Sequence, residues 1–306
     1  MSSFLNCSFE RLERKDVFKI LMLAILFSIT MTSCEFSTQN DKTKMAPKNY
    51  NLFKGTEVWS FAQKAREGDL EACRIILQSN PNIVNIEDSV YGNTILMLSI
   101  LHRDYDLFKT IMQFSPQINC YNKWQASPIY EASRYDDSEV RFVKDLIEAG
   151  ADINDKIYNE SHTKIMSTPL QEAAGHAPTE IVAFLINNGA DINFRNDFGG
   201  TALGDAVACD RYKNAILLIQ NGADINAPIF NSVDKKGNLT IPNNILMALR
   251  KDTPDFPSKK FFQKRELIKI LKAKGLDYDA EPVPDYIMKR IKSKYPLTWK
   301  LYVKYY

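Results

Sequence analysis

The chain has 306 residues, of which 39 are Lys or Arg and 37 are Asp or Glu, so its net charge is only +2. Its 5 cysteines include no C-x-x-C pair, and none of its 3 histidines pairs with Cys, Asp or Glu at the spacing of metal ligands. These features exclude the common zinc-site patterns, and the lack of a glycine-rich phosphate-binding loop excludes nucleotide sites of that type.

The N-terminal segment has the organisation of a secretory signal. Residues 11–19 carry four basic residues, and the apolar run ILMLAILFSITM follows at 20–31. This run is shorter than the ~20 residues that a helix needs to span a membrane. The following TSC, ending at Cys34, resembles a bacterial lipobox, with Met31 in place of the usual aliphatic residue. The resemblance implies a lipoprotein signal peptide over 1–33 and lipidation of Cys34. An ordinary signal with an incidental cysteine is the alternative.

Residues 34–56 are predicted to form a polar tether. The stretch EFSTQNDKTKMAPKN at 35–49 has almost no apolar residues and cannot bury enough surface to fold. A lipid at Cys34 would anchor the tether firmly, since each buried CH₂ of its acyl chains contributes ~0.8 kcal/mol. We therefore expect a cell-envelope protein, anchored to the inner or outer membrane and facing the periplasm or the cell surface.

The middle of the chain is internally repetitive. The heptapeptides EAGADIN, NNGADIN and QNGADIN end at Asn154, Asn193 and Asn226, each after an apolar run. A glycine just past a helical run takes the left-handed conformation that closes the helix. Upstream, TPLQEAA begins at Thr168 with an N-cap residue, a proline at the first helical position, and Gln171 to complete a capping box.

The same motif phase recurs along the chain. Helix starts of this type are predicted at Thr94, Ser127, Thr168, Thr201 and Asn244, with a degenerate first copy near Trp59. The pattern Thr-Pro-Leu-x-x-Ala, a second helix, then Gly-Ala-Asp-x-Asn resembles the ankyrin repeat. This resemblance implies an all-α ankyrin-repeat solenoid of about six helix-turn-helix repeats over 57–282, with a C-terminal capping helix over 283–306.

The chain departs from the family pattern in two ways. The fourth motif position, which is His in the family, is occupied by Met97, Tyr130, Gln171, Gly204 and Met247. The hydrogen bonds that this His makes between repeats are therefore in doubt. Longer loops are expected at 155–166 and 227–238, and KDTPDFPSKK interrupts the sixth copy at 251–260. Such inserts often lie on the binding face of a solenoid, and drift without function is the alternative.

The C-terminal segment is basic, with 13 Lys or Arg against 5 Asp or Glu over 257–306, whereas 35–256 carries 22 against 29. A helix at 261–275 is predicted to bury Phe262, Leu267, Ile270 and Leu271, and a further helix opened by Pro284 and Asp285 is predicted to bury Ile287, Met288 and Ile291. Because a solenoid exposes an apolar face at each end, we expect this segment to cap the stack. Contact of its lysines with anionic lipid headgroups is the alternative. Nucleic acid is not expected as a partner of an exported chain.

No catalytic site is predicted. Beyond the signal region, Cys73, Cys120 and Cys209 remain, and an oxidising compartment allows one disulfide among them. Cys73 falls at a buried position of a second helix. Each histidine has an explanation within the repeat pattern or an insert, although a Ser-His-Asp triad can assemble from distant residues. We therefore predict that the protein is not an enzyme and uses no cofactor or metal.

A protein-binding surface on the concave repeat face is predicted from the repeat phase. In the family, partners usually contact the loop tips and the exposed side of the first helix of each repeat. The tip position falls on Tyr91, Trp124 and Phe198, and the first-helix position on Leu101, His102, Arg134, Tyr135 and His176. Tyr, Trp and Arg are enriched among binding hot spots. Packing of each tip aromatic on the next loop is the alternative.

Two functions fit these features. The first is a membrane-tethered module for protein–protein binding, of which an immunity protein that neutralises a secreted toxin is one version. The alternative is an accessory or stress-protection protein of the cell envelope, or an unrecognised enzyme whose site is formed by the insert loops.

Overall fold

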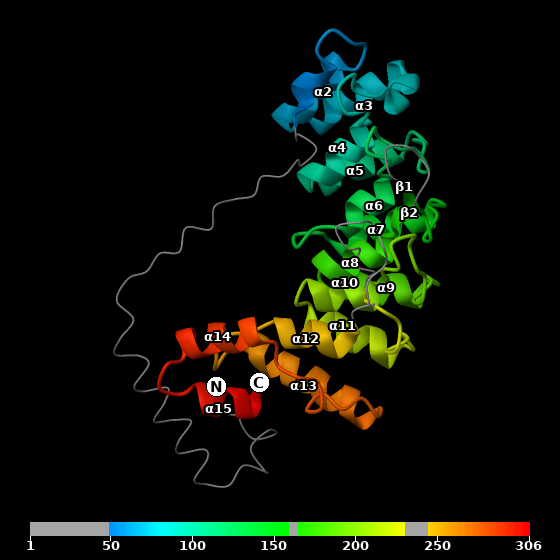
Figure 1. Ribbon diagram of the computed structural model, residues 1–306. Coiled ribbons are helices and arrows are strands. Elements are labelled where there is room, and N and C mark those ends of the chain that lie inside the picture. Colours follow the sequence, from blue (N-terminus) through cyan, green and yellow to red (C-terminus); the bar gives the residue numbers. More distant parts are fainter. Residues whose placement is uncertain (1–48, 159–164, 230–243) are drawn as a thin grey trace, which may run out of the picture. The chain divides into compact units, whose positions relative to one another are not determined.

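The computed structural model describes residues 49–158, 165–229 and 244–306 (Figure 1). All of them belong to one compact unit that begins at Met45. The predicted signal peptide, the lipidation site Cys34 and most of the predicted tether lie outside the described residues. His162 and parts of both insert loops do so as well.

The described residues contain six helix pairs that follow one another along the chain. The first helices of the pairs are α2 (Trp59–Glu67), α4 (Ile95–His102), α6 (Pro128–Ser133), α8 (Pro169–His176), α10 (Ala202–Ala208) and α12 (Ile245–Lys251). The second helices are α3 (Leu70–Ser79), α5 (Tyr105–Met112), α7 (Val140–Glu148), α9 (Thr179–Asn187), α11 (Tyr212–Gln220) and α13 (Lys259–Ala273). From α4 to α12, each first helix packs on the first helix of the next pair. The predicted all-α repeat solenoid is confirmed.

Each predicted motif start caps its helix. The side chains of Thr94, Ser127, Thr168, Thr201 and Asn244 accept a hydrogen bond from the backbone N–H three residues later. This satisfies one of the donors that a helix N-terminus leaves free. The predicted closing glycines are also confirmed, since Gly150, Gly189 and Gly222 have φ of +93°, +94° and +93°.

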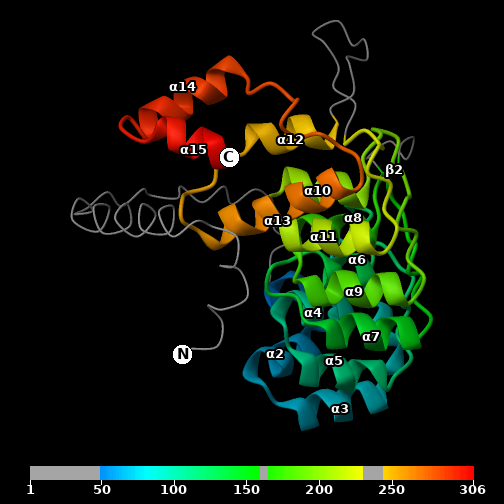
Figure 2. The same cartoon turned by 90° about the horizontal axis from the view of Figure 1, so that it is seen from below.

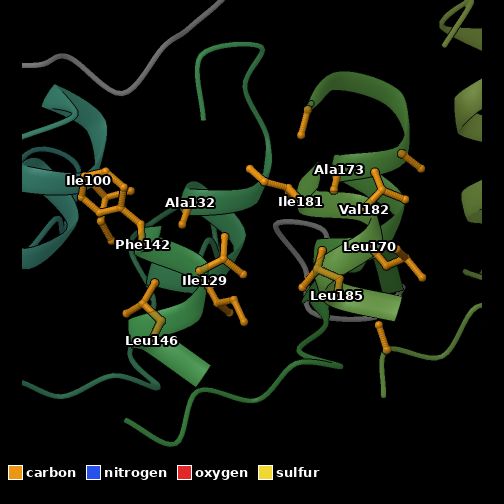
Figure 3. Close-up of a cluster of buried hydrophobic side chains, with 14 of the residues drawn as sticks. Ile100, Ile129, Ala132, Phe142, Leu146, Leu170, Ala173, Ile181, Val182 and Leu185 are labelled. Carbon is orange, nitrogen blue, oxygen red and sulfur yellow. The ribbon is translucent and has the colours of Figure 1, made fainter. Parts of the chain in front are cut away.

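One apolar core runs through the stack. From the second pair onward the first helix contributes the motif Leu or Ile, and in α2 Phe61 is buried instead. The second helix of each pair contributes at least two apolar side chains on its buried side. Figure 3 shows this arrangement for two neighbouring pairs, with Ile129 and Leu146 from α6 and α7, and Leu170 and Leu185 from α8 and α9. These side chains are almost completely removed from water.

The asparagines that end the first two heptapeptides, Asn154 and Asn193, and Asn119 in the preceding copy connect one repeat to the next. Asn154 Nδ2 donates to Gly189 O at 3.3 Å, and Asn154 Oδ1 accepts from the backbone N–H of Asp191 at 2.8 Å. The same two bonds join Asn119 to Gly150 and Asp152, and Asn193 to Gly222 and Asp224. The heptapeptide therefore recurs because its Asn pairs with the Gly and Asp of the following copy.

Other side chains occupy the place of the family's motif histidine. Gln171 Nε2 donates to Gly200 O at 2.9 Å, so a hydrogen bond between repeats is kept at this position. At Gly204 a Cβ would lie 2.7 Å from the backbone oxygen of Ile229, which explains why no side chain is present there. At Tyr130 the hydroxyl donates to Glu172 Oε1 of the next repeat. Inter-repeat bonding is thus retained at Tyr130 and Gln171 and replaced by close packing at Gly204.

The 155–166 insert forms secondary structure that the sequence analysis did not predict. Strand β1 (Ile157–Tyr158) pairs antiparallel with β2 (Ile165–Ser167). The β-branched and aromatic residues of the insert favour this conformation. Ile157 is buried against Ala126 and Tyr130, so the hairpin is packed onto the third repeat.

The predicted tether ends earlier than expected. Residues Tyr50–Phe53 form a short 3₁₀ helix, η1, whose Tyr50 and Phe53 are buried in the main core. A second 3₁₀ helix, η2, covers Pro81–Asn85. The composition argument applied only to 35–49, and the apolar residues that follow are sufficient to order the chain.

The C-terminal region differs from the prediction in its helix phase and number. The Ser258 side chain caps α13, so that Phe261 is buried and Phe262 is 57% exposed, the reverse of the prediction. Residues 283–306 form two helices, α14 (Asp285–Lys294) and α15 (Trp299–Tyr305), because Pro296 interrupts them. The pair encloses a separate small core. Its role as a cap of the stack remains a prediction.

Within the described part of the chain, no helix combines the length and the apolar composition that crossing a membrane requires.

Replacing Asn154 tests the connection between repeats. Asn154→Ala removes two hydrogen bonds to the next repeat, and we expect it to cost about 1–2 kcal/mol of unfolding free energy. Thermal melting should show a drop of roughly 3–6 °C. Asn221→Ala is the control, because Asn221 Nδ2 donates only to Leu217 O of its own helix. Equal losses in both variants would contradict the role of Asn154.

Candidate functional site

The predicted tip residues stand at the ends of ordered turns. The side-chain oxygens of Asp88, Asn122 and Asn196 accept hydrogen bonds from the backbone N–H groups of Tyr91, Trp124 and Phe198 at 2.6, 3.0 and 3.0 Å. The residue after each tip, Gly92, Gln125 or Gly199, has a positive φ of 70°, 63° or 77°. Gln125 therefore adopts the glycine conformation even though its copy lacks the glycine.

Two of the three tips are well exposed. Trp124 is 37% exposed and Phe198 43% exposed. Trp124 also contacts the ring of Tyr91, with the ring centroids 5.0 Å apart. Packing on a neighbouring loop and exposure to a partner are thus combined at Trp124.

The loops expose more apolar surface than the sequence analysis identified. Of the large apolar side chains that are exposed in the described residues, six lie on the loops between repeats. We call them the tip row: Val90, Tyr121, Trp124, Tyr158, Met166 and Phe198. These loops gather along one edge of the stack, where β2 is labelled in Figure 2. Tyr158 and Met166 could have been found by treating the 155–166 insert as part of the loop edge.

The prediction that Leu101 is exposed is wrong, because this side chain is only 2% exposed. Helix α4 is flanked by α6 and η2, and all of 95–101 is buried. The neighbouring His102 is half-buried, since the ring of Tyr50 stacks on it at a centroid distance of 4.6 Å. The segment before the repeats therefore covers this end of the first-helix face.

Arg134 and Tyr135 lie in a network around the buried carboxylate of Glu131. Arg134 Nη1 is 3.5 Å from Glu131 Oε1, and the Tyr135 hydroxyl donates to Glu131 Oε2 at 3.1 Å. The Arg103 guanidinium lies 4.9 Å from the Tyr135 ring centroid and pairs with Asp137 at 2.8 Å. Both predicted residues are half-buried, so each also contributes to stability.

His176 is exposed, as the sequence predicted. Its backbone oxygen accepts a hydrogen bond from Arg211 Nη2 at 2.8 Å. The same guanidinium also bonds Gly175 O at 3.2 Å and pairs with Asp136, two repeats earlier in the stack. Arg211 therefore links the turns after α6, α8 and α10 on the first-helix face.

A row of acidic residues follows the same face. Glu131, Glu172 and Asp205 occupy the fifth motif position of α6, α8 and α10. The Tyr130 hydroxyl donates to Glu172 Oε1 at 2.6 Å. Burial raises the pKa of Glu131. Burial, and then the charge of Glu172, raise the pKa of Asp205 to about 7. The sequence analysis missed this row, although it is visible as an acid directly after the fourth motif position.

Cys73 is buried, as predicted, and Cys73, Cys120 and Cys209 are all free thiols. Burial raises the pKa of Cys73 to about 12 and that of Cys120 to about 11, so neither forms a reactive thiolate at neutral pH. In the parts of the chain that the structure covers, no group of three His, Cys, Asp or Glu side chains could hold a metal ion.

The pKa of Asp205 predicts a pH dependence of stability. The folded state holds the proton up to about pH 7, whereas an unfolded Asp loses it near pH ~3.9. The contribution of Asp205 to stability should therefore be greatest below about pH 4, fall as the pH rises to about 7, and level off above it. Asp205→Asn removes the buried charge, so its melting temperature should exceed that of the wild type at about pH 8 and match it at about pH 4.

The exposed Glu180 on α9 supplies the control, because Glu180→Gln should leave the pH profile unchanged. Thermal melts across this pH range measure both variants. An Asp205→Asn profile that runs parallel to the wild type would show that this carboxyl group does not carry the effect.

The sequence matches a family model described as ankyrin repeats (3 copies) over residues 61–157 and 157–229. A putative ankyrin repeat protein, FPV014, from Fowlpox virus is 30% identical over 130 residues, which are 42% of this chain and 27% of that protein. The nuclear factor NF-kappa-B p105 subunit of Gallus gallus is 27% identical over 163 residues, 50% of this chain and 16% of that protein. Ankyrin repeat and SOCS box protein 11 of Mus musculus is 34% identical over 92 residues, 30% of this chain and 26% of that protein. The chain thus spans about a quarter or less of these curated relatives.

Proposed function

The chain belongs to the ankyrin-repeat family, and from this premise we propose that it binds a protein partner through the tip row and the adjoining first-helix face. The observation that carries the proposal is the exposure of six large apolar side chains on consecutive loops. Exposed apolar and aromatic groups that cluster on one edge are typical of protein interfaces. Proteins of this family are typically binding modules without catalytic activity, which supports a non-enzymatic role.

The side chains of the proposed surface indicate which groups a partner must present. Apolar side chains of the partner would pack on Trp124, Phe198 and their neighbours in the tip row. The excess of 29 Asp or Glu over 22 Lys or Arg in residues 35–256 favours a cationic group on the partner, because opposite charges select the partner and fix its orientation. We therefore propose a partner that presents Lys or Arg next to an apolar patch.

The N-terminal sequence supports a further part of this proposal. The basic segment, the apolar run and the lipobox-like TSC favour an exported chain held at a membrane by a lipid on Cys34. A binding module anchored in the cell envelope would be in a position to bind another exported protein. Neutralisation of a secreted toxin is the specific version that we propose.

Trp124→Ala tests the tip row. If Trp124 is a binding hot spot, the variant should lose ~2 kcal/mol of binding free energy, about a 30-fold rise in Kd. Melting should move little, because the side chain is partly exposed. The partner is first captured with a tagged fragment, 45–306, and identified by mass spectrometry. The affinities of the wild type and of Trp124→Ala for this partner are then compared by calorimetry.

Phe262→Ala is the matched control for this experiment. Phe262 is also an exposed aromatic residue, but it lies on α13 outside the tip row. Retention of binding in Phe262→Ala together with its loss in Trp124→Ala would support the proposed surface. Unchanged affinity in Trp124→Ala would refute it.

Cys34→Ala tests the anchor. Without the thiol, the lipid cannot be attached, so the full-length chain should leave the membrane fraction or remain unprocessed. Cell fractionation and the size of the protein on a denaturing gel measure both outcomes. Normal processing and membrane association in the variant would rule out lipidation at Cys34.

A further inference from the structure

The α14–α15 pair presents a dense cationic surface. Residues 283–306 carry six basic side chains, all exposed: Lys289, Arg290, Lys292, Lys294, Lys300 and Lys304. Asp285 is the one acidic residue of this segment. Lys294 pairs with Asp255 at 2.5 Å. Among the described residues, no carboxylate lies within ion-pair distance of the other five, so their charge is available to an anionic partner.

The turn that joins the two helices exposes an apolar side chain within this cationic surface. Leu297 is 96% exposed, although it is a large apolar residue. Trp299 follows it, with Lys292 Nζ at 4.7 Å and Lys300 Nζ at 5.7 Å from the ring centroid. A leucine, a tryptophan and lysines thus lie together at one turn. We call this group the apex: Lys292, Lys294, Leu297, Trp299 and Lys300.

The helix pair holds the apex in place. Ile287 and Ile291 of α14 are fully buried, and they share a small core with Tyr302 of α15. The Tyr302 hydroxyl donates to Pro254 O at 2.8 Å, and Arg290 Nη2 donates to Lys251 O at 2.6 Å. The buried sides of α14 and α15 are therefore used for packing. Trp299 is half-buried against this core, whereas Leu297 and the three apex lysines are exposed.

We propose that the apex is a contact site for anionic phospholipid. Leu297 enters the boundary of the acyl region, and Trp299 lies at the level of the headgroups. Lys292 and Lys300 contact lipid phosphates directly, and Lys294 does so by exchanging its exposed ion pair with Asp255 for a phosphate. Tryptophan prefers this interfacial position, and lysine side chains can extend from it toward the aqueous phase. Basic side chains close to a surface of anionic lipids each strengthen binding.

The exposed leucine favours lipid over nucleic acid. Lysines and a tryptophan could also bind single-stranded nucleic acid by charge and stacking. A fully exposed leucine at the tip of the turn adds nothing to such a complex, whereas it gains free energy when it enters a lipid interface. The proposal goes beyond protein binding and does not require the lipid at Cys34.

Vesicle binding by residues 45–306 tests the proposal without the contribution of the signal peptide or of a lipid. This range holds the whole compact unit, and circular dichroism with thermal melting checks its fold. We expect the protein to co-sediment with vesicles of phosphatidylcholine and phosphatidylglycerol, but not with phosphatidylcholine alone. Because exposed charges are screened by salt, the binding should weaken as the ionic strength rises.

Two variants test the apex itself. The triple change Lys292→Gln, Lys294→Gln and Lys300→Gln should weaken binding roughly 100-fold, about fivefold for each charge. Leu297→Ser should weaken it roughly tenfold, because the apolar side chain no longer enters the interface. Leu297 is so exposed that its replacement leaves the fold intact, which keeps this variant informative if the triple variant is unstable.

A second triple variant is the matched control. Lys269→Gln, Lys272→Gln and Lys274→Gln remove the same charge from exposed positions at the end of α13 and beyond it. Binding close to wild type in this control supports the apex. Equal loss in both triple variants, or no loss in Leu297→Ser, would overturn the proposal.

Single-stranded DNA separates the two classes of partner. Binding of DNA that the apex lysine variant loses and Leu297→Ser keeps, together with no vesicle binding, would overturn the lipid assignment in favour of nucleic acid. Trp124→Ala should bind vesicles like the wild type, so a failure at the apex is distinguishable from a failure of the protein-binding proposal.

Discussion

The stacking of one helix pair on the next is the interaction on which the rest of this structure depends. From α2 to α12 the helices have 6–10 residues, shorter than the ~12–15 residues at which an isolated helix becomes stable in water. Each pair is therefore stabilised by burying its apolar side against its neighbours. The asparagine bonds set the register of this stacking, and the same register places one loop per repeat on one edge.

The repeats differ from one another at individual positions and in one insert, and these differences determine which side chains each repeat exposes. Gln171 keeps a hydrogen bond between repeats, whereas Gly204 gives its space to the backbone of Ile229. The 155–166 insert adds Tyr158 and Met166 to the exposed loop edge. Because such changes are spread over neighbouring copies, a partner that contacts several repeats meets a different set of groups at each one.

Local sequence patterns predicted the repeated core of this fold, since helix caps such as Thr168 and closing glycines such as Gly189 act within a few residues. Long-range packing was not predictable in this way. His102 is covered partly by Tyr50, which lay in a stretch assigned to the polar tether. The burial of Phe261 instead of Phe262 depended on a cap at Ser258 that no repeat motif marks. Of the candidate site, the tip aromatics followed from the repeat phase. The positions of the acidic row are visible in the same phase, but the burial of Glu131 depends on the stacking of the repeats.

The Arg211 side chain has a mechanical consequence. Its guanidinium connects the turns of three successive repeats, whereas the bonds of Asn154 and Asn193 join only adjacent ones. A connection across three repeats resists bending of the solenoid at the two junctions that it crosses. The first-helix face is then stiff before a partner arrives, so little motion is frozen out on binding and less of the contact energy is lost to ordering.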